Sequence, residues 1–157
     1  MNERTKALLV HHNSETLTML QGALMRQGMN ITQAGSRAQA KRLLGGLNPV
    51  PLVFTDTQLP DGTWSDILSV AEKSAKPVNV IVVARVADTR FYVEVIEAGA
   101  YDFITPPFND TDLAYVVRSA LNNVASRREA ATSRRHLASG SALAEVHEEG
   151  SIHASTT

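Results

Sequence analysis

Short apolar runs recur along the chain, and between them lie segments whose apolar residues return every three or four positions. Four of these runs lack strict alternation of apolar and polar residues, which is typical of strands buried on both faces of a parallel sheet. They are Ala7–Val10, Leu52–Phe54, Val80–Ala84 and Tyr101–Ile104. A weaker strand is predicted over Asn30–Ala34, between the first two runs.

Segments with helical spacing alternate with these strands. The first, Glu15–Gln27, is preceded by Ser14 and followed by Gly28, two residue types that favour the two ends of a helix. The others are predicted over Arg37–Leu44, Trp64–Lys73, Thr89–Ala98 and from Asp110 onward. Regular alternation with short connections predicts an α/β fold with a doubly wound five-stranded parallel sheet. Ligands bind such sheets beyond the carboxyl ends of the strands.

The predicted domain covers residues 5–125, after which the pattern changes. Residues 126–138 contain two arginine pairs and are predicted to form a basic helical extension or linker. Apolar residues are few over 139–157, so burial there cannot offset the entropy lost on ordering. We therefore expect a disordered tail.

Composition narrows the classes of function. The formal net charge of −1 gives no overall attraction to nucleic acid or to an anionic membrane. The chain has no cysteine, which excludes disulfides, thiolate zinc sites and cysteine nucleophiles. The start of the chain, Met1–Lys6, is polar, and the apolar run after it is too short for a signal peptide or a membrane span. We expect a cytoplasmic protein without a nucleic-acid or membrane partner.

Two motifs fall at the predicted carboxyl edge of the sheet. Asp56 ends the run Val53–Asp56, and Leu-Pro-Asp-Gly follows at 59–62. The run Glu97–Phe108 reads Glu-Ala-Gly-Ala-Tyr-Asp-Phe-Ile-Thr-Pro-Pro-Phe. At this separation the two motifs resemble the receiver domains of bacterial two-component response regulators. The resemblance covers roughly residues 5–125 and implies a flavodoxin-like (βα)5 receiver fold in phosphorelay signal transduction.

The resemblance also implies a phosphorylation site built from five positions. Asp56 matches the phosphoacceptor. His11 and His12 stand in place of the acidic pair that holds Mg²⁺, Ala84 in place of a hydroxyl residue and Pro106 in place of a lysine. Mg²⁺ prefers oxygen ligands, and phosphoryl transfer needs cations and donors that offset its charge. We therefore expect a degenerate site with no bound Mg²⁺, no catalytic residue and no enzymatic activity.

Two functions remain open on these residues. One is a phosphoacceptor in a phosphorelay that uses Asp56 inefficiently, and the other is a phosphorylation-independent interaction module. In both, the domain signals by contact with a protein, either a histidine kinase or a downstream effector. The resemblance further implies an output surface made of the fourth helix, fifth strand and fifth helix. A homodimer formed through the same surface is a further alternative.

The histidines raise a third, more remote hypothesis. His11, His12 and Asp56 together offer ligands that suit a transition metal, which would make the domain a metal sensor. The simpler interpretation is that one histidine pairs with Asp56 and the other is solvated. Phe103 matches the aromatic that switches between exposed and buried positions in the family, and Ala84 leaves room for it to be held inward.

Overall fold

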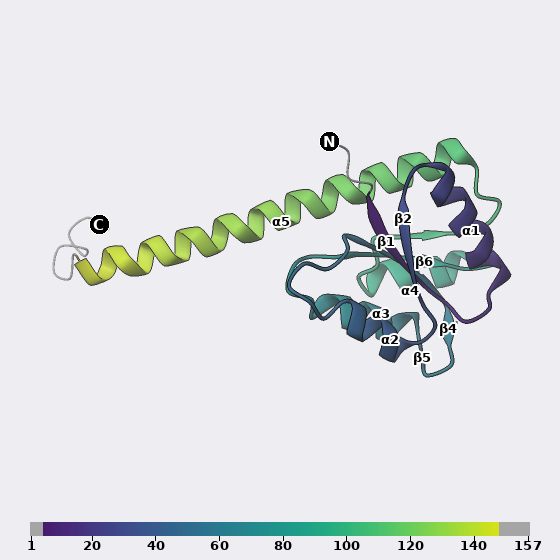
Figure 1. Ribbon diagram of the computed structural model, residues 1–157, viewed down its shortest axis with the longest axis horizontal. Coiled ribbons are helices and arrows are strands. Elements are labelled where there is room, and N and C mark those ends of the chain that lie inside the picture. The colour runs from purple at the N-terminus through teal and green to yellow at the C-terminus, as the bar shows by residue number, and fades with distance from the viewer. Residues whose placement is uncertain (1–4, 148–157) are drawn as a thin grey trace. The chain divides into compact units, whose positions relative to one another are not determined.

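Five parallel strands form the central sheet of the computed structural model, which describes residues 5–147, with side chains described through residue 138. In spatial order they are β2 (Asn30–Ala34), β1 (Lys6–Val10), β3 (Leu52–Asp56), β6 (Asn79–Val83) and β7 (Asp102–Ile104). The centre of the sheet is β3, which pairs in parallel with β1 and β6. This order is the doubly wound arrangement that the sequence predicts (Figure 1).

Helices cover both faces of the sheet. On one face α1 (Glu15–Arg26) and the first part of α5 (Asp110–His147) pack against alternate strand residues, including Leu9, Phe54 and Ile81. On the other face lie α2 (Arg37–Leu43), α3 (Trp64–Glu72) and α4 (Thr89–Glu97). The two clusters use opposite faces of the same strands because successive strand side chains point in opposite directions.

The helix ends follow the chemistry of the sequence. Ser14 and Ser36 cap α1 and α2, each accepting a hydrogen bond from a backbone N–H one turn later. Gly28 and Gly99 follow α1 and α4 with φ of 83° and 116°, in the left-handed region that glycine adopts without strain. The predicted α/β fold class is therefore confirmed, and the strand over Asn30–Ala34 has the predicted bounds.

A small hairpin interrupts the loop after β3, where the sequence analysis predicts no strand. Its strands are β4 (Gln58–Leu59) and β5 (Gly62–Thr63), paired antiparallel. The turn between them carries Asp61, whose two carboxylate oxygens accept hydrogen bonds from the backbone N–H groups of Arg37 and Ala38 at 2.7 and 3.0 Å. The hairpin therefore caps the start of α2 from a distant part of the sequence.

By internal contacts the chain divides into two units, Met1–Val124 and Ala125–Thr157. Helix α5 runs through 126–138 and past Ser139 to His147, and the disordered tail from Ser139 stays a prediction. The sequence over these positions is rich in alanine, the strongest helix former, and that preference does not need burial. Residues 148–157 of the expected tail lie outside the described residues. No helix among the described residues is long and apolar enough to cross a membrane.

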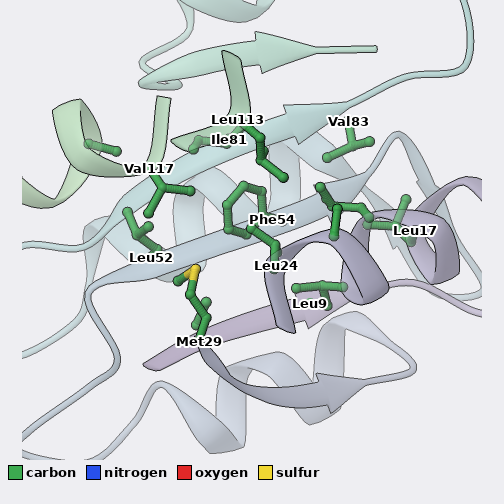
Figure 2. Close-up of a cluster of buried hydrophobic side chains, with 14 residues drawn as sticks. Leu9, Leu17, Leu24, Met29, Leu52, Phe54, Ile81, Val83, Leu113 and Val117 are labelled. Atoms are coloured by element: carbon green, nitrogen blue, oxygen red, sulfur yellow. The ribbon is translucent and has the colours of Figure 1, made fainter. Parts of the chain in front are cut away.

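Phe54 is the largest fully buried side chain and lies at the middle of one core cluster, among Leu24, Leu52, Leu113 and Val117 (Figure 2). We expect Phe54→Ala to lower the free energy of unfolding by about 3–5 kcal/mol, because it leaves a cavity between the sheet and the helices. Leu47→Ala is the control, since Leu47 is 85% exposed, and should leave the urea midpoint unchanged. Equal midpoints for the two variants would contradict this account of the core.

Candidate functional site

The carboxyl ends of the four strands β1, β3, β6 and β7 meet at one edge of the sheet. The register pairs Val10 with Thr55, Asp56 with Val83 and Val83 with Ile104. The residues that follow these strand ends are therefore brought together from four places in the sequence. They include the predicted site positions His11, Asp56, Ala84 and Pro106.

His11 is fixed by hydrogen bonds at the end of β1. Its backbone N–H donates to the carbonyl of Ala34 at 3.0 Å, which extends the pairing with β2. Its ring Nδ1 accepts from the backbone N–H of Ser14 at 3.1 Å. Since Nδ1 is an acceptor, a neutral ring carries its proton on Nε2, a buried atom with no hydrogen-bond partner among the described residues. The imidazole therefore orders the start of α1.

Burial sets the charge of His11. It lowers the pKa of this imidazole, and the nearby charge of His12 acts in the same direction. The negative charge of Asp56 opposes them and raises the pKa, but by less than burial lowers it. A neutral His11 beside an anionic Asp56 follows at neutral pH. The expected hydrogen bond or ion pair between these two side chains is absent, and only the electrostatic interaction is present.

The side chain of His12 has different surroundings from that of His11. It is exposed, and its Nε2 lies 3.4 Å from Nδ2 of Asn13, which has a positive φ of 55°. Within the described residues, no three His, Cys, Asp or Glu side chains are placed to hold a metal ion, so His11, His12 and Asp56 do not form such a group. The transition-metal hypothesis is therefore not supported by the geometry, because adjacent residues leaving a strand diverge.

Asp56 ends β3 as a half-buried carboxylate. Its Oδ1 accepts from the backbone N–H of Thr57 at 2.7 Å. Behind it, Thr55 is fully buried, and its hydroxyl donates to the carbonyl of Asp56 at 3.0 Å. The loop is thus anchored by local hydrogen bonds, and the carboxylate lies where a ligand of this sheet would bind.

The remaining positions bring no polar side chain to this edge. Ala84 is 9% exposed, and its backbone N–H donates to the carbonyl of Ile104 at 3.1 Å, so only a methyl group faces the site from this strand end. After β7, the Pro106–Pro107 peptide is cis. Pro106 supplies neither a charge nor a backbone donor.

Phe103 is half-buried, less than the sequence analysis expects. Two rings of α4 pack edge-to-face against it, Phe91 at 5.5 Å and Tyr92 at 5.8 Å between centroids. Phe91 also contacts Trp64 at the start of α3, at 5.7 Å. Phe103 also packs against the buried cluster of Trp64, Val82, Val95 and Ala100. The sequence analysis missed Phe91 and Tyr92, although their positions on a predicted helix were a usable signal.

Asp61 is a second residue whose role the sequence did not show. Its hydrogen bonds from the backbone N–H groups of Arg37 and Ala38 lower the pKa of its carboxyl group. Both carboxylate oxygens are engaged at the start of α2. Asp61 therefore serves as a cap of α2 rather than as a second carboxylate beside Asp56.

The sequence model of the response regulator receiver domain matches residues 7–118, and the chain belongs to this family. It is 28% identical over 118 residues to the response regulator protein PilR of Pseudomonas aeruginosa, covering 75% of this chain and 26% of that protein. It is 33% identical over 119 residues to the protein PetR of Rhodobacter capsulatus, covering 74% of this chain and 48% of PetR. The chain thus spans between a quarter and a half of these curated relatives.

Solved structures share the fold. The receiver domain of the sensor histidine kinase PA1611 from Pseudomonas aeruginosa PAO1 matches with a TM-score of 0.66 and 19% identity, over 76% of this chain and 99% of that one. That structure has a magnesium ion coordinated in its active site cleft. The identification of the receiver fold from the two sequence motifs is confirmed.

The neutral state of His11 gives a testable pH dependence. The unfolded chain binds a proton on this histidine near its ordinary pKa of 6.5, whereas the folded chain binds it only at lower pH. The stability contributed by the neutral ring is therefore complete above pH 6.5 and is lost as the pH falls below it. Between pH 7.5 and 5, the free energy of unfolding measured with urea should fall more steeply for the native protein than for His11→Gln. The difference between the two slopes should be less than about 1.4 kcal/mol per pH unit.

The exposed neighbour provides the control for this experiment. His12→Gln should change the pH profile less than His11→Gln does, since that ring is exposed and its charge is the smallest of the three influences on His11. The account of a buried neutral imidazole fails if His11→Gln and the native protein lose stability in parallel.

Proposed function

We propose that this receiver domain signals by protein–protein contact, with a degenerate phosphorylation site at Asp56 that is not used efficiently as a phosphoacceptor. Receiver domains of two-component systems interact with histidine kinases and effectors. The observation that carries the proposal is the set of side chains at the carboxyl edge of the sheet. Among the five family positions, all within the described residues, Asp56 is the one carboxylate, and the others carry a neutral imidazole at His11, the exposed His12, a methyl group and a proline.

This set of side chains does not fit Mg²⁺, the ion that the family implies. Mg²⁺ requires near-octahedral oxygen coordination and is usually held by at least one or two carboxylates. His11 offers no free lone pair when neutral, because Nδ1 already accepts from Ser14 and Nε2 carries the proton. Asp61, the nearest acidic residue in sequence after Asp56, is engaged with α2. The site therefore lacks the ligands that would bring the cation to Asp56.

Phosphoryl transfer to Asp56 would also lack the cations and hydrogen-bond donors that assist it. Transfer needs positive charge and donors that offset the phosphoryl oxygens in the transition state. Ala84 has no hydroxyl to donate, and Pro106 has neither a cation nor an N–H. Each missing interaction of this kind slows a reaction by about a hundredfold to a thousandfold.

The surface proposed for contact combines α4, β7 and the first part of α5. Tyr92 and Val93 of α4 are 43% and 44% exposed, and Tyr92 packs against Phe103 of β7. Exposed aromatic and aliphatic side chains next to a half-buried ring are typical of protein interfaces. A histidine kinase, a downstream effector or a second copy of the chain would each meet these side chains.

The first prediction of this proposal concerns magnesium. We expect 10 mM Mg²⁺ to change neither the melting temperature nor the fluorescence of Trp64, which follows the Asp56 loop at the start of α3. The double substitution His11→Asp and His12→Asp should restore both responses. A concentration ten times the dissociation constant stabilises a protein by roughly 1.4 kcal/mol. A saturable magnesium response of the native protein would show that other oxygens bind the ion.

The second prediction concerns phosphorylation. Attack of the Asp56 carboxylate on acetyl phosphate would form an acyl phosphate and release acetate. With acetyl phosphate and Mg²⁺ we expect little or no labelled protein by intact-mass spectrometry after one hour, because the groups that offset charge are missing. A variant that combines His11→Asp and His12→Asp with Ala84→Thr and Pro106→Lys should be labelled.

Asp56→Asn in the restored background is the control, and it should abolish the added mass. Stoichiometric labelling of the native protein on Asp56 within minutes would contradict the proposal. In that case the function would be that of a phosphoacceptor in a phosphorelay, with the histidines as part of its site.

A further inference from the structure

A groove lies between α2 and α3, on the face of the sheet opposite to α1 and α5. The two helices pack side by side (Figure 1), and the groove between them has a volume of about 240 Å³. None of the four strand-end positions His11, Asp56, Ala84 and Pro106 lines it. It is therefore a separate feature from the candidate phosphorylation site.

Positive charge dominates the lining of this groove. Arg37 and Lys41 of α2 and Lys73 at the end of α3 provide three cations, against the single carboxylate of Asp66. The Asp66 carboxylate already accepts a hydrogen bond from the backbone N–H of Thr63 at 2.9 Å, in the capping box of α3. Among the described residues, no ion pair joins the two lysines to an acid. Arg37 interacts electrostatically with Asp61, whereas the two lysines have no such acidic neighbour among the described residues, so the groove presents net positive charge.

The floor of the groove adds a hydroxyl and apolar surface. Ser74 Oγ is buried and has no hydrogen-bond partner among the described residues, although an unsatisfied buried polar atom is costly. Leu44 and Val70 line the same groove with aliphatic carbon. Cations and apolar carbon in one depression are typical of a binding site for an anion attached to an apolar group.

Helix electrostatics explain part of this arrangement. Lys41 and Lys73 lie in or beside the last turns of α2 and α3, where cations interact favourably with the helix dipole. The same effect disfavours Arg37, which is at the first position of α2. It also gives no reason for three cations to line one groove beside a single carboxylate.

We propose that the groove between α2 and α3 binds a small phosphate monoester with an apolar substituent. Its phosphate group would lie between Lys41, Lys73 and Arg37. A phosphate monoester carries up to two negative charges at neutral pH and several acceptor oxygens, which match three cations from two helices better than a single carboxylate does. The apolar substituent would cover Leu44 and Val70.

The test uses phenyl phosphate, inorganic phosphate and benzoate as probes of the full chain. Amide chemical shifts in ¹⁵N–¹H spectra at constant ionic strength would locate binding. We expect saturable shifts at residues of the groove, with phenyl phosphate binding at least about threefold more tightly than either other probe, because only it offers both the phosphate and the ring. Lys41→Ala and Lys73→Ala should each weaken binding about fivefold to tenfold, the usual effect of one charge-assisted hydrogen bond in a partly exposed site.

Arg42→Ala is the matched control, since Arg42 follows Lys41 on α2 but does not line the groove. It should keep the affinity of the native protein, and Asp56→Asn should do so as well, which separates the groove from the phosphorylation site. The proposal is overturned by an absence of saturable shifts at the groove. It is also overturned if benzoate binds as tightly as phenyl phosphate, or if Arg42→Ala weakens binding as much as Lys41→Ala.

Discussion

Burial of the central strand β3 on both faces is the constraint on which the rest of the molecule depends. Phe54 packs against α1 and α5, and its neighbour Val53 packs against α2 and α3. Inside such a sandwich a polar side chain must find a local partner, as Thr55 does by donating to the carbonyl of Asp56. Polar chemistry is thereby confined to the strand ends, where Asp56 leaves the core.

At that edge, the electrostatics differ from those of a site with several carboxylates. Neighbouring carboxylates repel one another and favour a bound cation. Here a half-buried imidazole adjoins the single carboxylate, and burial keeps His11 neutral in spite of Asp56. The imidazole holds the start of α1 through the backbone N–H of Ser14 instead of holding a ligand. His11 thus has a structural role at this position in the fold.

Aromatic packing connects the edge of the sheet to two helices. Phe103 contacts Phe91 and Tyr92 of α4, and Phe91 contacts Trp64 of α3. Edge-to-face pairs of this kind add about 0.5–1.5 kcal/mol each beyond the burial of their area. The four rings therefore form one continuous set that joins β7, α4 and the start of α3.

The sequence by itself determined the alternation of strands and helices, the helix caps and the family, because these follow from local periodicity and short motifs. It also named the residues at the strand ends, since parallel strands bring those ends to one edge. Only the tertiary structure decided that His11 bonds Ser14 rather than Asp56, that Asp61 caps a distant helix, and that Phe103 packs on α4. Those outcomes depend on side-chain directions and burial between segments far apart in the chain, which no local pattern encodes.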